Sequence, residues 1–161
     1  MVIDEVLRKL GRLESSLSEL YAWYSEVFEK DPEIAFAFFK MSAEEKGHAS
    51  LVDYQKRMAQ REAALDTDVP IDVAEIESAL GAVKRLRAPA TPPTVAEPLR
   101  ETLLLERSAA ECHYKNALKE ANPKLAGLLH ALGGEDRLHV ARIEEIARRR
   151  CIVFPEAAGP A

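Results

Sequence analysis

The chain has few of the residues on which small cross-linked or metal-ribbon domains depend. It has two cysteines, Cys112 and Cys151, which stand far apart and form no CxxC pair. This excludes a disulfide framework, a zinc ribbon and a rubredoxin-type iron centre. Glycine is also scarce, with 7 residues in 161, and no segment shows the sustained alternation of a β-strand. What remains is the pattern of an almost entirely helical protein.

Excess positive charge and long apolar runs are lacking too. The net charge is -5, so no basic field points to nucleic acid or to an anionic membrane. No stretch is apolar enough to span a bilayer, and Asp4 and Glu5 stand where a signal peptide needs apolar residues. We therefore expect a cytoplasmic protein. Its apolar share of 47% and its length suit one globular domain.

Capping signals predict a first helical hairpin. Its first helix is expected over about Asp4–Lys30. Asp31 then supplies an N-cap and Pro32 the proline favoured at the first helical position, so a second helix is expected to begin there and continue to about Leu65.

A second hairpin follows a long crossover at about 66–94. The crossover is expected to contain a short helix over Asp72–Leu86 and a proline-rich segment that cannot be helical. Thr94 and Glu97 fit a capping box that opens a third long helix. Asn122-Pro123 repeats the cap-plus-proline signal, and the fourth helix is expected to end near Arg150. Two hairpins joined by one long crossover predict a ferritin-like four-helix bundle over 1–150, with an irregular tail at 151–161.

Each long helix has an apolar stripe that a carboxylate interrupts near its middle. On the second and fourth helices a histidine follows three residues later, on the same face. Glu14 lies 17 residues before Asp31 and Glu45 lies 14 after it, so a rise of about 1.5 Å per residue puts them level within about one turn. The interrupting residues are Glu14, Glu45, His48, Glu106, Asp136 and His139.

These residues predict a two-metal site in the core. Four buried carboxylates would repel one another at a cost of several kcal/mol each, a large part of the roughly 5–15 kcal/mol that stabilises a domain. No Lys or Arg lies on the stripes to offset them. Two divalent cations would, and oxygen and nitrogen ligands suit iron or manganese, with zinc also possible. The alternative is a helical interaction module on which these acids are ordinary surface charge.

The pattern resembles the rubrerythrin branch of the ferritin-like superfamily. The motifs that carry the resemblance are Glu45-Lys46-Gly47-His48, Asp136-Arg137-Leu138-His139, and Glu14 and Glu106 with Tyr21 and Tyr114 beyond them. The resemblance implies two irons bound by the six interrupting residues. It leaves open whether Glu45 and Asp136, or in part Glu14 and Glu106, bridge the irons.

Three features depart from that family's pattern. No rubredoxin domain is present, so electrons would come from a separate donor protein. The second motif is DxxH, and Glu135 beside Asp136 is a rival ligand. Ala109 stands where peroxide-reducing members have a further Glu, which weakens the case for peroxide reduction.

The leading hypothesis is therefore a di-iron oxidoreductase that reacts with O2 or peroxide, using external electrons or ferrous iron. The alternative is a non-catalytic iron-binding or storage protein.

Tyr21 and Tyr114 are candidates for a hydrogen bond to a ligand carboxylate or for a redox-active phenol, although core packing would explain them equally. His113 could be an extra ligand, a hydrogen-bond donor to a ligand or a hydrogen-bonded core histidine, and we expect one of the last two. The resemblance also implies a homodimer.

Overall fold

The structure, a computed structural model, describes residues 2–68, 73–87, 91–107 and 137–154. These ranges contain the helices α1 (Ile3–Val27), α2 (Pro32–Arg61), α3 (Val73–Leu86) and α4 (Ala96–Glu106), and a further helix over 137–149. Within them no β-strand forms beyond an isolated bridge between Val2 and Asp68. The prediction of an all-helical protein is confirmed, and none of the described helices is both long and apolar enough to cross a membrane.

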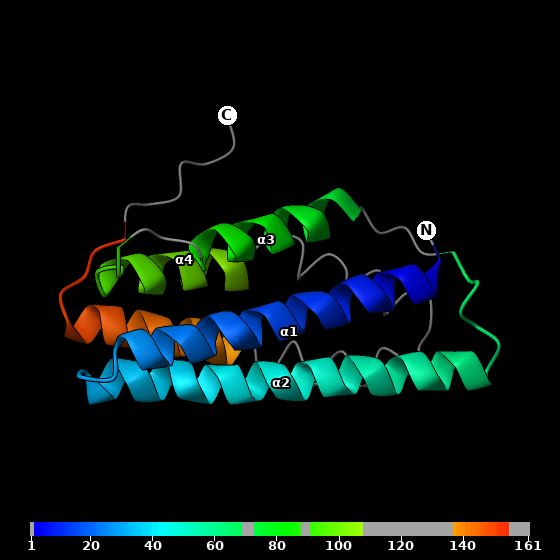
Figure 1. The fold of residues 1–161 in the computed structure, drawn as a ribbon, viewed down its shortest axis with the longest axis horizontal. Coiled ribbons are helices and arrows are strands. Elements are labelled where there is room, and N and C mark those ends of the chain that lie inside the picture. The colour runs from blue at the N-terminus through cyan, green and yellow to red at the C-terminus, as the bar shows by residue number, and fades with distance from the viewer. Residues whose placement is uncertain (1, 69–72, 88–90, 108–136, 155–161) are drawn as a thin grey trace.

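The two longest helices, α1 and α2, form an antiparallel hairpin, and α3 packs along α1 (Figure 1). The hairpin turns where the sequence predicts it. Helix α1 ends at Val27, three residues before the predicted end, and the turn brings the Asp31 N–H within 2.8 Å of the Phe28 carbonyl. Asp31 then caps α2, accepting a bond of 3.4 Å from the Ile34 N–H, and Pro32 opens the helix.

Helix α2 ends at Arg61, earlier than the predicted Leu65, because the backbone leaves the right-handed helical conformation just beyond it. Ala63 has a φ of 52°, in the left-handed region. The Ala64 N–H bonds to the Ala59 carbonyl at 2.9 Å, and the Ala63 N–H bonds to the Gln60 carbonyl at 3.2 Å. This pair of bonds is a Schellman motif, which satisfies the last carbonyls of a helix. Alanine, rather than the usual glycine, occupies its left-handed position.

The helix over 137–149 ends in the same way. Cys151 has a φ of 55°, the Ile152 N–H bonds to the Ala147 carbonyl at 2.9 Å, and the Cys151 N–H bonds to the Arg148 carbonyl at 3.3 Å. The helix that carries Glu45 and His48 and the helix that carries His139 therefore share one kind of ending.

Backbone groups, not a side chain, cap the start of α1. Val2 provides no side-chain cap, and the chain after α2 returns to this end. The N–H groups of Ile3 and Asp4 bond to the carbonyls of Thr67 and Leu65, at 2.9 and 3.2 Å. The return loop thereby satisfies donors that the first turn of a helix leaves without partners.

The predicted capping box before α4 is present in part. Glu97 reaches back and accepts bonds from the Thr94 N–H at 2.7 Å and from the Thr94 hydroxyl at 2.9 Å. In the full motif the hydroxyl would instead accept from the Glu97 N–H. These bonds to its ionised form lower the pKa of Glu97.

The predicted stripes form a large part of the core, and α3 adds Ile76, Ala79 and Val83. On α1 the stripe is buried up to Tyr24 and its last predicted position, Phe28, is partly buried. The fully buried stripe positions on α1 and α2 are Ile3, Leu7, Leu10, Glu14, Leu17, Tyr21, Tyr24, Ile34, Phe38, Met41, Glu45, His48 and Val52. The described positions of the other two stripes are Leu99, Leu103, Glu106, His139, Ile143 and Ile146, and they are buried as well. Tyr24 and Phe38 pack with their ring centroids 5.0 Å apart, between α1 and α2. The remaining positions of the third and fourth stripes lie outside the described residues.

Candidate metal centre

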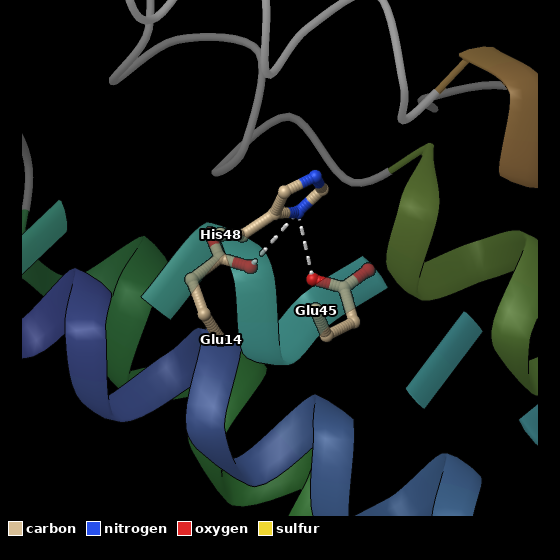
Figure 2. Close-up of side chains that lie close together, drawn as sticks. All are labelled: Glu14, Glu45 and His48. Atoms are coloured by element: carbon tan, nitrogen blue, oxygen red, sulfur yellow. Dashed lines mark hydrogen bonds and ion pairs between the residues drawn. The ribbon is translucent and has the colours of Figure 1, made fainter. Parts of the chain in front are cut away.

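The first cluster of the site lies between α1 and α2. Glu14 comes from α1, and Glu45 and His48 come from α2, one turn apart (Figure 2). His48 Nδ1 lies 3.0 Å from Glu45 Oε2 and 3.8 Å from Glu14 Oε2. All three side chains are at most 2% exposed. One atom from each lies within 4.8 Å of the others, so the three could hold one metal ion.

The second cluster joins α2 to α4 and the helix over 137–149. His139 Nδ1 lies 3.0 Å from Glu45 Oε1 and 3.4 Å from Glu106 Oε2. The three residues are again buried, and their ligand atoms lie within 4.8 Å of one another. This set of two carboxylates and one imidazole has the same composition as the first cluster.

Glu45 belongs to both clusters. Its Oε2 faces His48, and its Oε1 faces His139. The two imidazole rings lie 5.9 Å apart, one on each side of this carboxylate, and are inclined by 28°. Of the bridging arrangements that the sequence leaves open, this geometry favours one in which Glu45 is shared.

Protons neutralise part of the charge of the centre when no metal is present. Burial alone would lower the pKa of both histidines, but the adjacent carboxylates outweigh it and raise the pKa of His48 to about 11 and of His139 to about 10. For Glu45, burial and the repulsion of Glu14 and Glu106 raise the pKa to about 7, although both histidines oppose the rise. The clusters thus bind protons at the places where cations would lie.

Three atoms of the second cluster make no hydrogen bond to any described residue. They are Glu45 Oε1, Glu106 Oε2 and His139 Nδ1. The imidazole Nδ1 is within ion-pair distance of both carboxylate oxygens. Buried polar atoms without hydrogen bonds are costly and therefore rare in folded proteins. Converging oxygen and nitrogen atoms that lack such bonds fit a bound cation.

Tyr21 makes a hydrogen bond to a carboxylate of the centre, which is one of the alternatives that the sequence leaves open. Its buried hydroxyl donates to Glu106 Oε1 at 2.7 Å, while the other oxygen of Glu106 faces His139. Tyr21 therefore touches a carboxylate of the centre and packs against Phe38, with ring centroids 5.9 Å apart. A redox role for the phenol stays a prediction.

Glu44, which the sequence analysis does not single out, contacts His139 and is itself held by Arg142. Glu44 Oε2 lies 3.0 Å from His139 Nε2, and Arg142 donates two hydrogen bonds to Glu44. Burial opposes the ionisation of Glu44, but the bonds and charge of Arg142 and the nearby His139 prevail and lower its pKa. Glu44 lies off the stripe of α2, so periodicity gives no sign of it. The only available signal is that it precedes the EKGH motif.

Five of the six predicted ligands therefore meet in two overlapping clusters: Glu14, Glu45, His48, Glu106 and His139. Asp136, its rival Glu135, Tyr114 and His113 lie outside the described residues, and so does Ala109. That the five residues bind metal stays a prediction. The chain matches no protein-family model, no curated protein and no solved structure.

Proposed function

We propose that this protein is a ferritin-like four-helix bundle that binds two metal ions, iron by preference, and acts as a redox protein on O2 or peroxide. The observation that carries the proposal is Glu45, a fully buried carboxylate shared by two Glu/His clusters. Described helices from both predicted hairpins supply the clusters, as a bundle with one crossover requires.

The charge of the described centre supports two divalent ions. Glu14, Glu45 and Glu106 supply three negative charges, and two divalent ions would supply four positive ones once the histidines are neutral. A single further carboxylate would complete neutrality. Asp136, which the sequence predicts to be a ligand, has the required charge. One divalent ion would leave the three carboxylates with a net negative charge.

The types of ligand favour iron or manganese over other metals. Each cluster offers two carboxylates and one imidazole, and among the described residues no cysteine takes part. Such mixed oxygen and nitrogen sets suit ferrous iron and manganese, whereas soft thiolate sets select zinc or copper. Three protein ligands also leave positions open for a small molecule. When bound, two adjacent redox metals supply electrons to O2 or peroxide.

The residues of the chain have separate tasks in this proposal. The three carboxylates hold and neutralise the ions, and the imidazoles complete the ligand sets as neutral groups. Tyr21 orients Glu106 through its hydrogen bond. The buried apolar stripes around the centre limit the access of water. Electrons for repeated turnover would come from ferrous iron or from a separate donor protein.

The experiment that tests the proposal is an anaerobic titration of the metal-free protein with ferrous iron, followed by air. We expect two irons per chain, and on oxidation the near-ultraviolet charge-transfer absorption of ferric iron. Glu14→Gln should weaken the first site, whereas Glu26→Gln, on the exposed side of the same helix, should change nothing. Many irons per chain would favour storage instead. No retained metal would refute the proposal.

A further inference from the structure

The two nitrogens of His139 have different surroundings. Nδ1 faces Glu45 and Glu106 inside the centre, at 3.0 and 3.4 Å. Nε2 lies 3.0 Å from Glu44 Oε2, on the other side of the ring. Glu44 and Glu45 are consecutive residues of α2, so the imidazole lies between two neighbouring carboxylates of one helix.

The groups around His139 determine which of its two nitrogens donates a hydrogen bond and which can bind a metal. An ionised carboxylate only accepts hydrogen bonds, so a neutral His139 must donate to Glu44 from Nε2. The lone pair is then on Nδ1, which points at the centre. A histidine ligand commonly has its other N–H held by a carboxylate, which fixes the tautomer and the ring orientation.

Arg142 holds Glu44 in place. Its guanidinium donates to Glu44 Oε2 at 2.7 Å and to Glu44 Oε1 at 3.2 Å. Arg142 lies three residues after His139, so Glu44 contacts two side chains of the same helix. Arg142 is 18% exposed and Glu44 24%, so water reaches this pair less than it reaches a surface ion pair. The planar fork fixes both carboxylate oxygens in a way that lysine could not.

From this geometry we infer that Glu44, fixed by Arg142, is a positioning residue that holds His139 as the Nε2–H tautomer and aims its Nδ1 at the second metal of the centre. The inference rests on the proposed two-metal function. It adds two residues to the site, and it predicts unequal effects on the two clusters, because Glu44 contacts His139, the imidazole of the second cluster.

Zinc provides a test that does not depend on activity. Zinc affinity of the full chain is measured by competition with a chromogenic chelator, for the wild type and for Glu44→Ala, Glu44→Gln and Arg142→Met. We expect Glu44→Ala to weaken one of the two sites about 10–100-fold and to leave the other unchanged. Glu44→Gln keeps an oxygen acceptor and should lose less. Lys40→Met is the matched control, because Lys40 contacts Glu44 only at 3.8 Å from a 52% exposed side chain.

Nitrogen-15 NMR of the zinc-loaded wild type gives a second, independent result. We expect His139 to show a slowly exchanging Nε2–H and a zinc-bound Nδ1, and we expect this N–H to exchange faster in Arg142→Met. A purely structural role would lower the unfolding temperature of the metal-free variants and weaken both sites alike.

The outcomes separate this inference from the proposed function. If the wild type binds two zinc ions and Glu44→Ala binds both as tightly, the positioning role is wrong while the two-metal site stands. If the NMR of the wild type shows zinc bound through Nε2 of His139, the positioning role is also wrong. This result comes from the wild type alone, so it does not depend on whether Glu44→Ala folds. If the wild type binds no metal, the proposed function itself fails.

Discussion

Metal binding at neutral pH is expected to release protons from the centre, because each ion replaces protons held by the metal-free clusters. In the metal-free protein the pKa of His48 is about 11 and that of His139 about 10, so both imidazoles are charged at pH 7. Burial raises the pKa of Glu45 to about 7, so this carboxyl holds its proton more readily than an exposed glutamate does. Ligands must be deprotonated to bind metal. Loading two ions should therefore release at least about two protons per chain at pH 7, one from each histidine.

The same reasoning sets the pH dependence of affinity. Between pH 7 and about pH 10 each ion displaces about one histidine proton, so its affinity should rise about tenfold per pH unit. Calorimetric titration with zinc in buffers of different ionisation enthalpy counts the protons directly. His48→Ala should release about one proton fewer, and Glu26→Gln should match the wild type. Zinc binding with no proton release would refute this account of the centre.

Stability without metal should show the opposite trend with pH. The folded-state pKa values of both histidines lie above the unfolded value of about 6.5, so their contribution to stability is complete below that pH. It is lost as the pH rises through about 10 to 11. The pKa of Glu45 is also raised, so its contribution is present below about 4.5 and lost as the pH rises through about 7. With a chelator present, the unfolding temperature should fall from pH 6 to pH 9.5, and zinc should reverse the trend.

Substitutions at three further positions test the contacts that stabilise the helices. Tyr21→Phe removes the buried donor to Glu106 and should lower the free energy of unfolding in urea by about 1–3 kcal/mol; equal stability would show that the bond contributes nothing. Ala63→Gly relieves the left-handed alanine after α2 and should raise stability by up to about 1 kcal/mol in thermal unfolding, whereas a loss would mean that the strain is absent. Asp31→Ala removes the cap of α2 and should lower the free energy of unfolding by about 1 kcal/mol, whereas Asp31→Asn should retain most of the cap. If both variants lose the same stability, the effect comes from the ion pair with Arg150 and not from the cap.

The periodic spacing of apolar residues predicts which face of a single helix lies in the core. The positions of Glu14, Glu45 and His48 follow from apolar spacing and from the Asp31-Pro32 turn, and the structure brings these side chains together. A buried carboxylate on an otherwise apolar face is a strong signal, because its cost must be offset by something nearby.

Contacts that depend on how helices face one another could not be predicted in this way. Glu44 lies off the stripe of α2, and its contacts with His139 and Arg142 depend on the packing of a distant segment. The sharing of Glu45 by two clusters depends on the same packing. The sequence does not predict the early end of α2, because the left-handed position after the helix is occupied by Ala63 and not by the glycine that usually marks such an end.

Anomalous diffraction from crystals of the iron-loaded protein, collected on both sides of the iron edge, tests the central claim most directly. The account predicts two iron peaks per chain, one bound by Glu14, Glu45 and His48 and the other by Glu45, Glu106 and His139, with the Glu45 carboxylate between them. A single peak, no peak, or iron bound away from Glu45 would contradict it.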